Sequence, residues 1–94
     1  MEIQFTTRMF KEGRTFVAQA LELDVSSCGG SKEKALQNLK EAVRLFLEEA
    51  GKMGTLEQIL EEAGYSKRKS KLASPNFISV QRVTLPLPLT HAKA

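Results

Sequence analysis

Apolar and polar residues alternate along the first 28 positions of the chain with the period of two that is typical of half-buried β-strands. From Ile3 to Met9 the odd positions carry Ile, Phe, Thr and Met, and the even positions are polar. A short polar connection around Gly13 interrupts the alternation and predicts a hairpin turn, because glycine readily takes a positive φ. The pattern predicts a three-stranded antiparallel sheet with strands over residues 1–10, 15–21 and 23–28.

The period then changes to that of an amphipathic helix. Between Ala35 and Ala50 apolar residues recur at steps of three and four, and this stripe has to be covered by the sheet. Ser31 follows Gly29-Gly30 and is the expected N-cap, because its hydroxyl can accept a hydrogen bond from the first helical turn. A capping box over residues 55–58 predicts a second, shorter helix that reaches Ala63.

The last third of the chain combines a basic connection with a return of strand character. Residues 64–76 are rich in Lys, Ser and Arg without an apolar period, which predicts a solvated linker. Residues 77–86 alternate again and predict a fourth, C-terminal strand, followed by a tail over 87–94. Pro86 and Pro88 lack amide hydrogens, so this strand ends at a sheet edge or leaves the sheet to touch another subunit. The predicted order is βββααβ, an α+β fold with helices on one face.

Length and composition bound the class of protein. Ninety-four residues suit a single domain over 1–94 with its core in 1–63. A chain of this size buries only about 60 to 70% of its unfolded surface, so we expect self-association into a dimer or tetramer. Cys28 is the only cysteine, which fits a reducing cytoplasm, and we expect it to be a half-buried apolar residue. The sequence contains neither a membrane-spanning run nor a signal-peptide pattern.

Residue types that support catalysis are scarce. Histidine occurs once, at His91, and the glycines do not form a phosphate-binding motif. We therefore expect no enzymatic activity, no cofactor and no metal site. The alternative is a metal-dependent nuclease, in which Glu22 and Asp24 point to the same face of a strand and share a divalent cation.

Charge is distributed unevenly along the chain. The net charge is +3, yet residues 64–94 contain six basic and no acidic residues, so residues 1–63 carry −3. Four of these basic residues lie in the run 66–71. The run is either a solvated linker or a phosphate-binding segment, although it lacks the interleaved aromatic residues of a single-strand binder. The candidate phosphate contacts are Lys67, Arg68, Lys69 and Lys71.

Residues 13–51 contain a series of short motifs in a fixed order: Phe16-Val17-Ala18, Glu22-Leu23, Gly30, Ala35-Leu36 and Asn38-Leu39-Lys40-Glu41-Ala42. In this order they resemble the core of the HicB family of antitoxins. The resemblance implies a partial ribonuclease-H-like fold without nuclease activity. It also implies a cytoplasmic homo-oligomer that binds and neutralises a small mRNA-cleaving toxin of the HicA type.

An inhibitor of a basic RNA-cleaving protein can cover its active site with acids in the place of phosphates. The expected partner-binding residues are Glu12, Glu22, Asp24 and Glu33. Many HicB proteins also carry a C-terminal DNA-binding segment. Only nine residues follow Leu85, so we expect no recognisable DNA-binding domain here. The alternative function is a stand-alone nucleic-acid-binding protein that uses residues 66–71.

Overall fold

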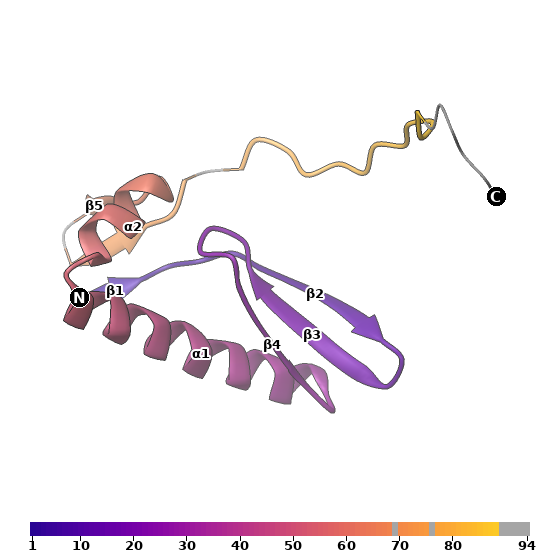
Figure 1. Ribbon diagram of the computed structural model, residues 1–94, viewed down its shortest axis with the longest axis horizontal. Helices are drawn as coiled ribbons and strands as arrows, with labels where there is room; N and C mark the ends of the chain where they lie inside the picture. The colour runs from indigo at the N-terminus through magenta and orange to yellow at the C-terminus, as the bar shows by residue number, and fades with distance from the viewer. Residues whose placement is uncertain (69, 76, 89–94) are drawn as a thin grey trace.

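Two small sheets and two helices build the fold (Figure 1). The computed structural model describes residues 1–68, 70–75 and 77–88 of the chain. The elements are β1 (Glu2–Ile3), β2 (Thr7–Glu12), β3 (Thr15–Ala20), β4 (Val25–Gly29), α1 (Lys32–Met53), α2 (Leu56–Glu62), β5 (Ser66–Arg68) and β6 (Lys71–Ala73). One sheet has the order β2-β3-β4 and the other β1-β6-β5. The predicted α+β class is confirmed, and the arrangement differs from βββααβ.

The β2-β3-β4 sheet, called the main sheet below, is antiparallel throughout. Glu12 pairs with Thr15, so two residues form the β2–β3 turn. Gly13 has a φ of 60° at the first of these positions, where such a tight turn favours glycine. The prediction of three antiparallel strands is confirmed. The first strand of this sheet starts at Thr7 and the third at Val25, later than the sequence pattern indicated.

The prediction of one continuous strand over residues 1–10 is wrong, because the chain leaves the sheet between β1 and β2. The Thr6 amide donates to both carboxylate oxygens of Glu22, at 2.8 and 3.0 Å, and the Thr6 hydroxyl donates to the same group at 2.8 Å. β1 pairs in parallel with β6 instead, with Ile3 beside Leu72. The carboxylate of Glu22 therefore takes the bond that a neighbouring strand would make.

The prediction of a solvated linker over residues 64–76 is also wrong. β5 and β6 form an antiparallel hairpin in which Lys67 lies opposite Leu72. Tyr65 packs against the hydrophobic core just before the hairpin, and Leu72 is half-buried. Strands of three residues are too short to produce a recognisable alternation, so the composition alone suggested a linker.

The described part of residues 77–86 does not form the predicted fourth strand. Residues 77–88 run past the main sheet without secondary structure, and none of the residues that the structure describes there joins a strand ladder. Alternation indicates that a segment can pair, but pairing also needs a neighbouring strand. Most of the expected tail, residues 89–94, lies outside the described residues.

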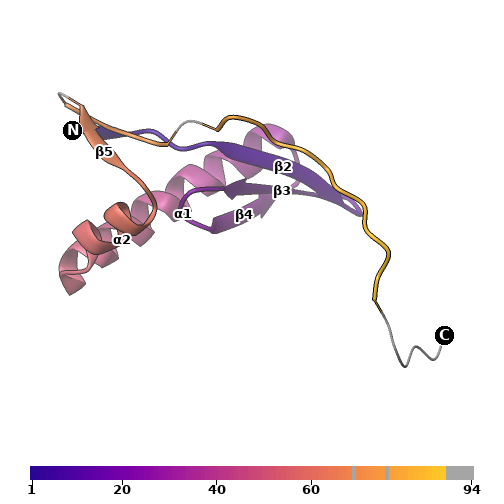
Figure 2. The ribbon, with the colours of Figure 1, turned by 90° about the horizontal axis from the view of Figure 1, so that it is seen from above.

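α1 covers one face of the main sheet (Figure 2), as the sequence predicts. Its N-cap is Ser31, whose hydroxyl accepts from the Lys34 amide at 3.0 Å, and it ends at Gly54 with a φ of 75°. Leu39 is fully buried against small residues of β3. The core consists of Ala18, Ala20, Leu23, Ala35, Leu39 and Val43. Alanine at these strand positions lets the helix approach the sheet closely.

α2 follows α1 after a short turn, close to its predicted position. The expected capping box is not formed, because the Thr55 side chain makes no bond to the first turn of α2. Its hydroxyl donates instead to the Ala50 carbonyl of α1, at 3.4 Å. Ile59 and Leu60 of α2 pack against the edge of the core. α2 therefore extends the helical layer at the end of α1.

Gly29 permits a close contact between β4 and the start of α1. A Cβ atom at this position would lie 2.7 Å from the Ala35 amide nitrogen and 2.9 Å from the Lys34 carbonyl carbon. Both are backbone atoms of the helix, so they cannot move aside as a flexible side chain would. The neighbouring Gly30 has open space where a Cβ would stand.

We therefore expect Gly29→Ala to destabilise the fold by about 1 to 3 kcal/mol, the usual cost of overpacking. Gly30→Ala is the matched control and should change the free energy of unfolding by less than about 0.5 kcal/mol, as surface substitutions usually do. Urea denaturation followed by circular dichroism measures both. Equal stability of the two variants would contradict the proposed contact.

Candidate protein interface

The face of the main sheet opposite α1 is open to solvent. Met9, Ala18 and Ser27 are paired across the three strands and lie on the α1 side. Because side chains alternate along a strand, the residues before and after each of them point to the other side. We call this surface the open face; its central residues are Arg8, Phe10, Val17, Gln19, Ser26 and Cys28. Among the residues that the structure describes, no helix covers it.

An apolar row crosses the open face. Phe10 pairs with Val17, and Val17 pairs with Cys28, so the three side chains are neighbours on adjacent strands. Phe10 is 40% exposed, and the Arg8 guanidinium lies over its ring at 5.6 Å from the centroid. Cys28 is exposed, which corrects the expectation of a half-buried residue. The row is a surface that a protein partner could bury.

A chain of polar contacts lies beside this row. Arg8 donates to the side-chain carbonyl of Gln19, and the Gln19 amide donates to Asp24 Oδ1 at 3.1 Å. Asp24 follows β3 in the turn over residues 21–24 and has a φ of 53°. These contacts hold an exposed carboxylate at the rim of the open face.

The structure does not gather the four predicted partner-binding acids. Glu22 is turned toward Thr6, where its two oxygens accept three hydrogen bonds. Glu12 is exposed at the hairpin end of the open face, and Asp24 is exposed beyond the opposite end of β3, at a separation of roughly 20 Å along the strands. Glu33 is exposed in the first turn of α1, on the other layer. Glu22 therefore has a structural role, and Glu12 and Asp24 are the acids that border the open face.

The geometry required by the metal alternative is not present. Glu22 and Asp24 lie in a turn, so they do not share a strand face, and Glu22 is engaged by Thr6. Within residues 1–68, 70–75 and 77–88, no three His, Cys, Asp or Glu side chains are close enough to form a metal site. The sequence could not reveal this, because the orientation of Glu22 depends on residues sixteen positions away.

Three of the four predicted phosphate contacts lie on the β5–β6 hairpin. Lys67, Arg68 and Lys71 are exposed, whereas Lys69 lies outside the described residues. Arg68 is opposite Lys71, so their side chains share a face, and Lys71 also neighbours Glu2 of β1. The hairpin thus presents basic side chains from two strands with one acid next to them.

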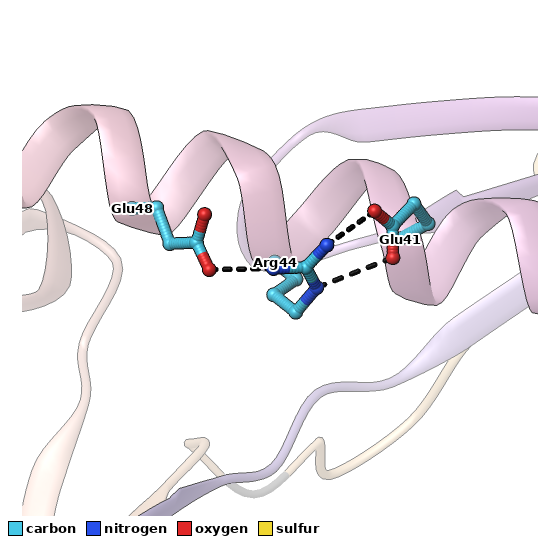
Figure 3. Close-up of polar contacts among 3 residues, drawn as sticks. All are labelled: Glu41, Arg44 and Glu48. Atoms are coloured by element: carbon cyan, nitrogen blue, oxygen red, sulfur yellow. Dashed lines mark hydrogen bonds and ion pairs between the residues drawn. The ribbon is translucent and has the colours of Figure 1, made fainter.

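A hollow lies between β1, α1 and α2. It has a volume of about 490 Å³ and an apolar floor formed by Ile3, Val43, Leu47 and Leu56. On its rim Arg44 is held between Glu41 and Glu48 (Figure 3), with 2.6 Å to Glu48 Oε1. The hydrogen bonds and charge of Glu41, followed by the charge of Glu48, raise the pKa of Arg44. All three side chains are more than half exposed, so these ion pairs order the rim and add little stability.

Tyr65 is half-buried, and its hydroxyl oxygen is the one enclosed side-chain polar atom without a partner within the described residues. Its hydroxyl is enclosed and forms no hydrogen bond, while its ring packs against the core. Burial, together with the charge of Glu22, raises the pKa of Tyr65 to about 12. No local pattern in the sequence indicates this, because Tyr65 lies in the segment predicted to be a linker.

Comparison with protein-family models, curated proteins and solved structures finds no match to this chain. The resemblance to HicB antitoxins therefore stays a prediction. In the part of the chain that the structure describes, none of the helices combines the length and apolar character needed to cross a membrane.

We expect Tyr65 to make stability fall as the pH rises from about 10 to about 12. The unfolded chain releases the phenol proton near pH 10, whereas the folded protein keeps it to about 12, so the unfolded state binds fewer protons in this window. Tyr65→Phe should reduce this loss and leave stability at pH 7 almost unchanged, because the hydroxyl has no partner. Urea denaturation of both proteins at pH 7, 10 and 11 checks this. A marked loss at pH 7 would contradict the unpartnered hydroxyl.

Proposed function

We propose that the chain is a non-enzymatic, HicB-like antitoxin that binds a small HicA-type mRNA-cleaving toxin and covers its active site. The observation that carries the proposal is the open face, where the apolar row of Phe10, Val17 and Cys28 lies beside the restrained carboxylate of Asp24. The motif resemblance over residues 13–51 supports the identity of the partner. The open face is the proposed contact surface.

The open face has the physical properties of a binding surface. Its residues stand on strands whose other face is fixed by α1, so little conformational freedom is lost on binding. The apolar row supplies surface to bury, and aromatic residues such as Phe10 contribute strongly to protein interfaces. A carboxylate at the rim can pair with the cationic groups that a ribonuclease uses to hold phosphate, and this favours the correct partner.

The four predicted acids receive different roles in this proposal. Asp24 and Glu12 border the open face and are the proposed contacts with the toxin. Glu22 positions Thr6 and the turn that carries Asp24. Glu33 stands on α1, where its charge is favourable near the helix N-terminus.

A second candidate function is binding of nucleic acid through the β5–β6 hairpin. It is favoured by the exposure of Lys67, Arg68 and Lys71 on adjacent strands. Such contacts would be dominated by phosphate charge and would have no sequence preference.

Binding to a HicA-type toxin tests the first function. The purified chain is titrated with an inactivated toxin of this type, preferably one encoded beside its own gene. We expect Phe10→Ala to weaken the complex at least tenfold, because truncation of a central aromatic residue removes about 1.4 kcal/mol or more. Asp24→Asn should weaken it by a smaller factor; asparagine tolerates the positive φ at this position, so the charge alone is removed.

Leu45→Ala is the control for these variants, because Leu45 is 52% exposed on α1, away from the open face. It should leave the affinity within about twofold of the unaltered chain, as energetically neutral surface positions do. Thermal melting verifies that each variant is folded. Failure of the unaltered chain to bind the toxin, or equal effects of Phe10→Ala and Leu45→Ala, would argue against the proposal.

Retention of RNA as a function of salt tests the second function. If the hairpin binds phosphate, the affinity should fall steeply between 50 and 200 mM salt, by a factor on the order of ten or more for a few contacts. Replacing Lys67, Arg68 and Lys71 together by alanine should abolish retention, while Lys32→Ala and Lys52→Ala on α1 should not. Absence of retention at low salt would exclude this function.

A further inference from the structure

β2 is an edge strand with an unoccupied row of backbone groups. The Leu21 amide donates to the Thr6 carbonyl, and the two-residue turn closes on the pair Glu12 and Thr15, so the even-numbered residues of β2 turn their backbone groups toward β3. Antiparallel alternation then places the amides and carbonyls of Thr7, Met9 and Lys11 at the outer edge. No described strand pairs with that edge.

The other edge of the main sheet is partly occupied. β4 lies beside α1, and the Asn38 side-chain amide of α1 donates to the Cys28 carbonyl at 2.8 Å. β2 has no equivalent cover within the described residues. Unpaired edges of this kind invite pairing with another strand.

The 77–88 segment has the complementary properties. It is extended past the sheet and carries large apolar side chains that remain in solvent: Ile78 is 101% exposed, Val83 75% and Leu85 78%. Its described residues join no strand ladder. Several large apolar side chains exposed in succession mark a segment that is buried in an assembly.

The order of residues in the segment matches the edge of β2. Val83, Leu85 and Leu87 are apolar and odd-numbered, and they alternate with Thr84, Pro86 and Pro88. When the amides and carbonyls of the odd residues face β2, the nitrogen atoms of both prolines lie on the outer side of the added strand. No hydrogen-bond donor is needed there, so the lack of an amide hydrogen costs nothing. The prolines also prevent a further strand from joining outside the added one.

The side chains fit only one direction of pairing. In an antiparallel pair, residues directly opposite share a face, so Val83, Leu85 and Leu87 would join Met9 on the α1 side. A hollow of about 340 Å³ opens there at the edge of β2, lined by Met9, Phe10, Lys11, Phe16 and Lys32. Parallel pairing would bring Thr84 and Pro86 to this side and leave the leucines on the open face.

A second copy of the chain supplies the 77–88 segment in the antiparallel orientation to β2. β6 runs parallel to β1, and the 77–88 segment of the same chain continues past the sheet in the direction of β2 (Figure 2). Arg82 there shares a hollow with Arg8, Met9 and Phe10 of its own chain. The segment would have to reverse to pair antiparallel with its own β2, whereas a second copy related by a two-fold axis meets this requirement directly.

We propose that residues 83–87 of one copy add to β2 of a second copy as an antiparallel fourth strand, and that the exchange is reciprocal. Each main sheet then has four strands, and each hollow beside Met9 receives an apolar side chain from the other copy. The interface involves the outer edge of β2 and its α1 side, and it forms in the absence of a toxin.

Solution mass with proline variants tests the pairing. Light scattering should give a dimer for the unaltered chain. Leu85→Pro removes an inward-pointing amide and should shift the protein to monomer, with at least a tenfold higher dissociation constant. Thr84→Pro is the matched control; it removes only an outward-pointing amide and should remain dimeric. A monomeric unaltered chain, or equal behaviour of the two variants, would overturn the proposal.

Disulfide trapping identifies the partner strand. In a Cys28→Ser background, Met9→Cys is combined in turn with cysteine at Val83, Leu85 or Leu87. Opposed residues of a hydrogen-bonded antiparallel pair have Cα atoms about 5.5 Å apart, within the range of a disulfide. At least one pair should give a reducible covalent dimer, whereas Met9→Cys with Thr84→Cys should not.

The remaining arrangements differ in whether the disulfide joins two chains or forms within one chain, and in which residue forms it. A disulfide within one chain would show that the segment pairs with its own β2 and would overturn the exchange. Cross-linking through Thr84 alone would indicate parallel pairing and would overturn it too. All measurements are made without toxin, so their outcome is separate from that of the toxin titration.

Discussion

Close packing of α1 on the alanines of β3 determines the rest of the structure. Ala18, Ala20 and Ala35 are completely buried, and they form one core cluster with the larger Leu39 and Val43 of α1. Because the side chains of a strand alternate, this contact also decides which residues of the main sheet face solvent. The open face with Phe10 and the hollow beside Met9 both follow from which face α1 covers.

The bond between Glu22 and Thr6 has a comparable effect on the chain path. It ends the ladder between β2 and β3 and directs the N-terminal residues to β6, so the chain forms two small sheets instead of a single larger one. A hydrogen bond from a backbone amide to a charged group typically contributes about 1.5 to 3 kcal/mol, enough to fix such a junction. The same turn presents Asp24 to solvent. Glu22 thus fixes the turn in which the Asp24 carboxylate is exposed.

The sequence predicted the parts of the fold that depend on long periodic patterns. α1 and its cap at Ser31 were predictable, since the apolar stripe repeats over several turns, and the β2–β3 hairpin was predictable from alternation on both sides of Gly13. The β5–β6 hairpin could not be predicted, because its strands are too short to show a period. Residues 77–86 have the alternation of a strand, but no strand among the described residues of the chain lies beside them. Of the candidate acids, the orientation of Glu22 depended on a contact with Thr6, which no local pattern indicates.

The connection between β4 and α1 consists only of Gly30 and Ser31, and Gly29 already touches the helix backbone. Each residue of an α-helix turns the next by about 100°. An insertion of one residue here would rotate the apolar stripe of α1 away from the sheet and bring Lys34 and Asn38 to the buried positions of Ala35 and Leu39. Relatives of this chain should therefore tolerate changes of residue type in this connection far better than changes of its length.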